Sequence, residues 1–476
     1  MSDEAPLRVG TPQGRWVIVA AVLGSGVVFL DGTVVNVALP TISADLGASV
    51  QGLQWLLDSY LVTLSALLLL GGSAGDRYGR RRMFVAGLAG FAGASVLCGL
   101  APDTGFLIAA RALQGVAGAL LVPASLSIIS SGFDPDDRGR AIGTWSGLAA
   151  ISGAVGPLLG GWLVDTASWR LIFFLNVPLA AAAAAIALRH VPETRDDEAG
   201  PLDVSGAALV SAGIALVAYG LIERSAVPGL AGLAALLAFV AVERRSDHPM
   251  LPMSLFRSRQ FTGANLTTFA VYGAMGAAWF LIVLRLQVTL GYSALEAGAS
   301  LSPFTVIMVT LSARIGGLAQ RIGARLPMTI GPVLSAAGLL LFAEVGPGDH
   351  YAAAVLPAIL LFGSGMTITV SPLTSAVLGA VDRRRAGVAS AVNNVAARLA
   401  GLLGIAIIPA VAGIDTGGGL ARSLDTGYPT ALRISAAACF AGAVVAWLFV
   451  RESARVRPVT HPAQTHGCLD PGVEAA

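Results

Sequence analysis

Three charged residues lie deep inside membrane-length apolar stretches in the first half of this chain: Asp31 in the first, Asp58 in the second and Arg111 in the fourth. A charge at such depth costs roughly 2.5–3.5 kcal/mol on insertion scales, so it normally faces a cavity, a partner or a proton path. An aspartate that binds and releases a proton while it faces alternate sides is what a proton-coupled carrier requires. We therefore assign Asp31, Arg111 and Asp58 as candidate proton-coupling residues.

The composition indicates a polytopic membrane protein. The 476 residues are 55% hydrophobic and only 12% charged, whereas soluble domains have about 25% charged residues. The net charge of +2, spread over short loops, argues against nucleic-acid binding. The three cysteines and five histidines show no metal-ligand spacing, and no Gly-rich phosphate loop ends in lysine. We expect no metal, no cofactor and no enzymatic activity.

Apolar stretches near 20 residues, enough to cross about 30 Å of hydrocarbon, recur along the whole chain. They predict an all-α protein with fourteen membrane helices, at 16–39, 53–75, 82–101, 105–130, 140–164, 170–190, 203–222, 227–243, 261–286, 296–316, 327–345, 351–377, 387–412 and 429–450. Most arginines, including Arg138 and Arg383 to Arg385, fall in the loops on the N-terminal side. The positive-inside rule therefore places both termini in the cytoplasm. We expect a multi-pass protein of the cell (inner or plasma) membrane.

The sequence repeats internally with an offset of about 245 residues. The basic loop at Arg77–Arg80 corresponds to Arg321–Arg325, and Arg138-Gly139-Arg140 corresponds to Arg383–Arg385. Two such halves are typical of transporters whose site lies at the repeat interface. We expect a disordered N-tail (1–14), a six-helix bundle (15–195), two inserted helices with linkers (196–258), a second six-helix bundle (259–451) and a disordered C-tail (452–476).

The three deep charges share one predicted depth, because Asp31, Asp58 and Arg111 lie about eight, five and six residues from the outer ends of their helices. This predicts a buried polar cluster, since an unpaired arginine would be costly there. Alternatively, Arg111 reaches the outer surface and only stabilises the fold. Asp58 either forms a salt bridge with Arg111 or attracts a positively charged substrate.

The loop from Gly72 to Arg82, with Asp76 and Gly79 inside it, resembles the signature loop of the major facilitator superfamily. Glycines allow a tight turn, and the aspartate can pair with an arginine or cap a helix. The resemblance implies a gating role for a set of residues at this end of the bundle: Gly72, Asp76, Arg77, Gly79, Arg80 and Arg138. The second-half copy has Gln320 in place of the aspartate, which predicts an asymmetric gate.

The fifth stretch contains a stripe of small residues with a proline: Gly143, Ser152, Gly156, Pro157, Gly160 and Gly161. Glycines at such spacing permit tight helix packing, and proline favours a kink. The spacing resembles the antiporter motif of drug exporters, with Ser152 in place of one glycine. The runs around Asp31 and Arg111 resemble further motifs of the 14-span drug:proton antiporters (EmrB/QacA-like multidrug exporters). The resemblance implies the major facilitator fold, with two six-helix bundles plus two extra central helices, and export driven by proton entry.

Polar side chains within other stretches are candidates to line a substrate path: Asn36, Gln54, Asp58, Gln114, Asn265, Thr268, Asn393, Asn394 and Arg398. Each amide and hydroxyl is more often an interhelical hydrogen bond than a substrate contact. Arg398 either binds an anionic group or pairs with a backbone carbonyl. Arg285, at a predicted helix end, is explained by a side chain that reaches the membrane surface.

Together these features predict a proton-coupled exporter of drugs, antibiotics or other amphiphilic toxic compounds that works by alternating access. Its partners would be protons, the amphiphilic substrate and membrane lipid, and it would be a monomer. A symporter or an exporter of one metabolite shares the fold, and a non-transporting membrane sensor is a more distant alternative. The sequence does not name the substrate or its charge.

Overall fold

The structure, a computed structural model, describes residues 7–196, 203–246, 251, 253–381, 386–414 and 420–451. The expected C-tail, the first six residues and the loop with Arg383 to Arg385 lie outside these ranges. Thirteen described helices are long and apolar enough to cross a membrane, and the count rises to fourteen when the two parts of a helix bent by 50° near Leu68 form one span. The predicted all-α architecture is confirmed.

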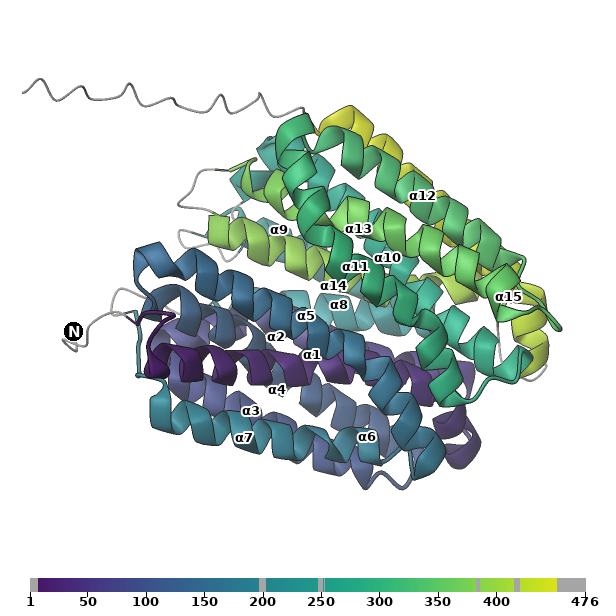
Figure 1. Ribbon diagram of the computed structural model, residues 1–476, viewed down its shortest axis with the longest axis horizontal. Coiled ribbons are helices and arrows are strands. Elements are labelled where there is room, and N and C mark those ends of the chain that lie inside the picture. Colours follow the sequence, from purple (N-terminus) through teal and green to yellow (C-terminus); the bar gives the residue numbers. More distant parts are fainter. Residues whose placement is uncertain are drawn as a thin grey trace, which may run out of the picture.

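The helices form two bundles with an inserted pair between them (Figure 1). The first half comprises α1 (Pro12–Leu46), α2 (Val50–Tyr78), α3 (Arg80–Gly99), α4 (Thr104–Gly132), α5 (Pro135–Thr166), α6 (Leu171–Phe174) and α7 (Asn176–His190). The second half comprises α10 (Arg259–Leu284), α11 (Ala294–Ile322), α12 (Arg325–Ala343), α13 (Leu356–Leu378), α14 (Ala386–Val411) and α15 (Leu420–Phe449). Short helical turns η1 (Met253–Arg257), η2 (Arg285–Thr289) and η3 (Tyr351–Val355) precede or extend three of these helices. We refer below to the Pro12 end and the Leu46 end of the bundle, after the two ends of α1.

Helix α1 is longer than predicted at both of its ends. The Thr11 side chain accepts the N–H of Gly14 and Pro12 is the first helical residue, whereas Gly47 ends the helix with φ +63°. These are the residue types that favour helix starts and stops. Pro40 lies inside the helix instead of near its end. Asp31 is therefore fifteen residues from Leu46 and lies closer to the middle of its helix than predicted.

The expected disordered N-tail is wrong for residues 7–14. Leu7 is only 8% exposed, and its backbone joins Gly132 and Asp134 at the α4–α5 turn. The Val9 N–H also donates to the Asp137 carboxylate at 3.0 Å. Burial of Leu7 and these hydrogen bonds offset the entropy lost when the segment is ordered.

The sixth predicted span is interrupted. Helix α6 ends at Phe174 and α7 begins at Asn176, with Leu175 between them in helical geometry. The two pieces count as one span, Leu171–His190. Asn176, directly after the interruption, has a side chain that is fully buried inside the first bundle.

The inserted pair consists of α8 (Val204–Ile222) and α9 (Ala226–Glu243). Helix α8 lies between the two halves in Figure 1, where Ile214 and Ala218 pack with Val62 and Ala66 of α2 and Leu402 of α14. Helix α9 packs on α8, and its outer face is exposed, with Val227 at 78%. The pair therefore covers one side of the joint between the halves, with α8 in contact with both halves and α9 outside it.

The two halves contact each other closely at the Leu46 end. The Asp165 carboxylate accepts the first N–H groups of α11, from Ala294 at 3.0 Å and Leu295 at 2.8 Å. The Gln287 side chain donates to the Val37 carbonyl at 2.9 Å, and the Gln54 side chain donates to the Ile405 carbonyl at 2.7 Å. These hydrogen bonds fasten α1, α2 and α5 of the first half to the second half.

Candidate functional site

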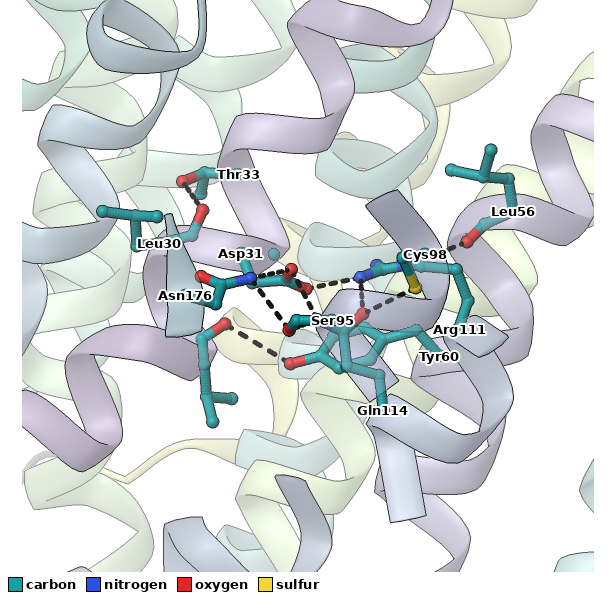
Figure 2. A network of polar contacts seen from close by, with 12 residues as sticks. Leu30, Asp31, Thr33, Leu56, Tyr60, Ser95, Cys98, Arg111, Gln114 and Asn176 are labelled. Atoms are coloured by element: carbon teal, nitrogen blue, oxygen red, sulfur yellow. Dashed lines mark hydrogen bonds and ion pairs between the residues drawn. The ribbon is translucent and has the colours of Figure 1, made fainter. Parts of the chain in front are cut away.

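Asp31 and Arg111 form an ion pair in the interior of the first half. The Arg111 Nη1 atom lies 2.5 Å from the Asp31 Oδ2 atom, and the two side chains are 1% and 0% exposed (Figure 2). The predicted association of these residues is confirmed, and the alternative in which Arg111 reaches the surface is wrong. Both charges are desolvated, so loss of either one leaves the other unpaired at a cost of about 3–5 kcal/mol.

Neutral polar groups from three further positions complete the hydrogen bonding of the pair (Figure 2). The Gln114 amide donates to Asp31 at 3.0 Å and its carbonyl accepts from Arg111 at 2.8 Å. The Asn176 amide donates to Asp31 at 2.9 Å. Ser95 accepts from Gln114 at 2.8 Å and from Asn176 at 3.4 Å. The site thus surrounds a buried charge pair with hydrogen-bonding groups from α3, α4 and α7, as such a network requires.

Tyr60 and Leu56 on α2 hold the guanidinium from the other side. The Arg111 Nε atom donates to the Leu56 carbonyl at 3.2 Å, and the guanidinium carbon lies 4.3 Å from the centre of the Tyr60 ring. Arg111 and Gln114 are three residues apart on α4 and therefore share one helix face. Leu56 and Tyr60 are four residues apart on α2 and likewise share one helix face. Helix periodicity therefore places both α2 residues beside the guanidinium of Arg111.

Asp58 does not belong to this network. Its side chain is fully buried, and neither carboxylate oxygen has a hydrogen-bond partner among the described residues. The predicted alternative of a salt bridge to Arg111 is wrong, because Arg111 uses its donors on Asp31, Gln114 and Leu56. Asp58 lies one helical turn after Gln54, which donates to Ile405 of α14, so it occupies the face of α2 that turns toward the joint between the halves.

The glycines of α5 bring this helix close to both halves at once. A Cβ at Gly156 would lie 2.1 Å from the Thr33 Oγ1 atom, two residues beyond Asp31 on α1. A Cβ at Gly161 would lie 2.5 Å from the Cα of Leu295 on α11. A Cβ at Gly298 of α11 would lie similarly close to the carbonyl oxygen of Pro157. Gly160 packs on Val34 in the same way, whereas a Cβ at Gly143 would meet nothing within 4 Å. Close approach therefore explains the glycines of this motif except Gly143.

The residues of the predicted gating loop contact one another and the segment after α7. Asp76 and Arg80 form an ion pair at 2.8 Å. Gly79 has φ +110°, and a Cβ there would lie 2.6 Å from the Glu193 carboxylate, which accepts the Arg81 N–H at 3.0 Å. Gly72 lies against Pro123 of α4, and Arg77 stacks on Tyr78. Arg138 lies in the first turn of α5, where its N–H donates to the Asp134 carbonyl.

The predicted path-lining residues fall into different environments. Gln54 and Asn393 make hydrogen bonds between helices, the latter to Asn265 at 3.2 Å and Thr268 at 2.8 Å. Asn36 donates to the carbonyl of Gly32 on its own helix, and Gln114 belongs to the Asp31 network. Asn394 is exposed.

Arg398 is partly exposed and makes no hydrogen bond or ion pair to any described residue. The predicted alternative, in which it pairs with a backbone carbonyl, is therefore not seen in the described part of the chain.

Arg285 is a second buried cation, in contrast to the predicted surface position. It is 6% exposed, pairs with Asp425 of α15, donates to the Val345 carbonyl at 3.2 Å and lies 5.1 Å from the Tyr428 ring centre. Arg285 is the first residue of η2, and its pairing ties this end of the span to α15. Burial with a partner replaces the expected reach toward the membrane surface.

Ser95 and Asn176 are the site residues that sequence reasoning missed. A serine in an apolar helix carries little signal, because its hydroxyl usually bonds to its own backbone. Asn176 carried a stronger signal, since an amide followed two residues later by Pro178 in a membrane stretch marks a possible break and a polar interior.

The geometry describes a membrane protein of two pseudo-repeated helical bundles with an ionisable site inside one of them. The family model of the Major Facilitator Superfamily matches residues 21–405. The chain belongs to this superfamily, a family of transporters.

Known relatives agree with this assignment. The chain is 33% identical to the multidrug resistance protein Stp of Mycobacterium tuberculosis over 406 residues, 83% of this chain and 75% of that protein. It is 33% identical to the puromycin resistance protein pur8 of Streptomyces alboniger over 472 residues, 94% and 93% of the two chains. A crystal structure of a POT family transporter superposes with a TM-score of 0.71 at 13% identity and covers 93% of this chain and 98% of that chain, which shows the shared fold.

Proposed function

We propose that this protein is a proton-coupled exporter of drug-like or antibiotic amphiphiles, with Asp31 as a proton-carrying group. The Asp31–Arg111 pair carries the proposal: it is a titratable pair enclosed by five helices of one half. Membership of a transporter superfamily and relatives named for drug resistance support the export of toxic compounds.

The distribution of arginines supports a cytoplasmic location of the Pro12 end. The Leu46 end, where the halves are joined by Asp165, Gln287 and Gln54, then faces outward. In this assignment the structure is closed to the outside. Alternating access requires these contacts to break while the Pro12 ends approach each other.

The two acids differ in their hydrogen-bond partners. Asp31 accepts hydrogen bonds from Arg111, Gln114 and Asn176. Asp58 has no donor among the described residues, which is costly for a buried carboxyl group. A proton bound by Asp31 in the outward-open state would neutralise the partner of Arg111 and weaken the pair. We propose that this change is linked to release of the drug.

The test is proton release from proteoliposomes in response to added compound, with a cationic dye (ethidium), a neutral antibiotic (chloramphenicol) and an anionic amphiphile in parallel. Asp31→Asn should abolish compound-dependent proton movement while the protein still inserts in the membrane. Asp45→Asn is the matched control, since Asp45 lies on the same helix in a partly exposed pair with Arg170 and such pairs contribute little. Undiminished proton movement in Asp31→Asn would overturn the assignment.

The direction of transport separates the export reading from a symporter. With an imposed pH gradient, an antiporter moves substrate against the direction of proton flow, whereas a symporter moves it along. A protein without transport activity would show neither, and its membrane behaviour would be insensitive to Asp31→Asn.

A further inference from the structure

One stripe of α14 faces the first half of the molecule. Val395 packs at the edge of the apolar cluster that contains Tyr60 and Leu64. Leu402 packs with Val62 and Ala66 of α2. The Ile405 carbonyl accepts from Gln54. Arg398 is three residues after Val395 and four before Leu402, so helix periodicity places it on this same stripe.

Arg398 is the member of this stripe that has no partner. Its side chain is partly exposed and makes no hydrogen bond or ion pair within the described ranges. Tyr60 belongs to the cluster that Val395 contacts, but its hydroxyl donates to the Val28 carbonyl at 3.3 Å. A guanidinium with no counter-charge inside a membrane protein is expensive.

Asp58 does not supply the missing negative charge. The Gln54–Ile405 contact gives a common reference point on the antiparallel helices α2 and α14. Asp58 lies four residues from Gln54, which is about 6 Å along the helix axis at 1.5 Å per residue. Arg398 lies seven residues from Ile405 in the same direction, which is about 10 Å. Side chains lean toward the N-terminus of their own helix, which moves these two groups in opposite directions. Asp58, with both oxygens unpartnered, is also not in contact with a cation.

We propose that Arg398 binds an acidic group of the exported molecule, and that the substrates include amphiphiles with a carboxylate or a similar ionised oxygen acid. The guanidinium presents a planar fork that matches two carboxylate oxygens, and its partial exposure leaves it accessible. The position in the joint means that the acid is held by one half while the other half moves past it. This inference rests on the proposed export function, because it names a substrate class for the same transporter.

The experiment compares two fluorescent amphiphiles that differ in one group: 11-(dansylamino)undecanoic acid and its primary amide. Binding to the purified protein in nanodiscs is measured for wild type, Arg398→Gln and Arg398→Lys. Arg433→Gln is the matched control, since it removes an arginine of the same half from an exposed pair with Glu344. We expect wild type and Arg433→Gln to bind the acid about tenfold or more tightly than the amide, a preference that a charged hydrogen bond supplies.

In Arg398→Gln the preference should disappear while amide binding is unchanged, and Arg398→Lys should retain part of it. An unchanged preference in Arg398→Gln, an equal loss of both ligands, or no preference in wild type would overturn the proposal. If Arg398→Gln is not recovered folded, Arg398→Lys decides: a reduced preference for the acid with unchanged amide binding supports the proposal, and an unchanged preference overturns it. Because binding is read without a proton gradient, a preserved preference in a protein that fails to transport would overturn the export proposal and leave the acid site intact.

Discussion

The side-chain amide of Asn176 lies 2.9 Å from the carboxylate of Asp31, although 145 residues separate them in the chain (Figure 2). Asn176 is the first residue after the short interruption of the sixth span at Leu175. The residue that restarts this span thus supplies a neutral donor to a buried charge.

Replacement of Asn176 by alanine should destabilise the protein by about 1.5–3 kcal/mol, the range for a hydrogen bond to a charged group. Asn36→Ala is the control, because Asn36 donates to a carbonyl of its own helix, and it should cost about 1 kcal/mol or less. Thermal unfolding in detergent measures both. Equal losses in the two variants would contradict a specific role of Asn176.

Neutralising both members of the ion pair separates its structural role from its proton role. Asp31→Asn alone should cost about 3–5 kcal/mol, since it leaves Arg111 buried and unpaired. In Asp31→Asn combined with Arg111→Gln most of that stability should return, but compound-dependent proton release should stay absent. A double variant that regains both stability and proton release would show that the pair only holds the helices together.

The glycine motif of α5 offers a matched pair of substitutions. Gly156→Ala introduces a Cβ only 2.1 Å from Thr33, whereas Gly143→Ala meets nothing within 4 Å. We expect Gly156→Ala to lose about 1–3 kcal/mol of folding stability through overpacking. The added methyl group should also reduce transport, because it displaces α5 from its packed position on α1. Gly143→Ala should be neutral or gain about 0.5–1 kcal/mol. Yield of folded protein and drug-dependent transport report both effects, and a damaging Gly143→Ala would refute this packing argument.

Asp203, just before α8, should make the stability of the inserted pair depend on pH. Its carboxylate accepts the N–H of Gly206 and the hydroxyl of Ser205, each at 2.8 Å, and the Gly206 bond above all lowers the pKa of Asp203 below its ordinary value. A lowered folded-state pKa means that the stabilisation is present above the unfolded-state pKa of about 3.9 and is lost as the pH falls through the folded value.

Asp203→Ala should therefore cost about 0.5–2 kcal/mol at pH 7, as for loss of a helix cap, and the difference from wild type should shrink below about pH 4. Thermal unfolding at pH 7 and at lower pH measures this. Asp203→Asn keeps a capping side chain and should remove the pH dependence. A wild type and Asp203→Ala difference that stays constant with pH would contradict the role of the ionised carboxylate.

Hydropathy was sufficient to predict the order of the spans and a number at the upper end of the thirteen to fourteen found among the described residues, because the hydrocarbon thickness imposes a length and a composition on each helix. It was also sufficient to predict that Asp31 and Arg111 meet, since neither charge is tolerable alone. Hydropathy was not sufficient to predict which acid is paired. Asp31 and Asp58 had equivalent sequence signals, but Asp31 lies on the helix face that meets Arg111 and Asp58 does not.

Three further features escaped prediction for physical reasons. The extension of α1 past Pro40 depends on tertiary packing, which overrides the usual role of proline as a helix end. The burial of Arg285 depends on Asp425, a residue 140 positions away. Ser95 gains its role only from the side chains that fold against it, so no local pattern marks it.

The two seams between the halves are unequal, and the inserted helix makes them so. Along one seam, α5 and α11 meet directly through glycines. Along the other, α8 touches α2 of the first half and α14 of the second. If the halves rock as proposed, α8 cannot keep both contacts unchanged, and it would travel with one half and slide on the other. The two inserted helices, which repeat nothing else in the chain, would thereby make the motion along one seam differ from the motion along the other.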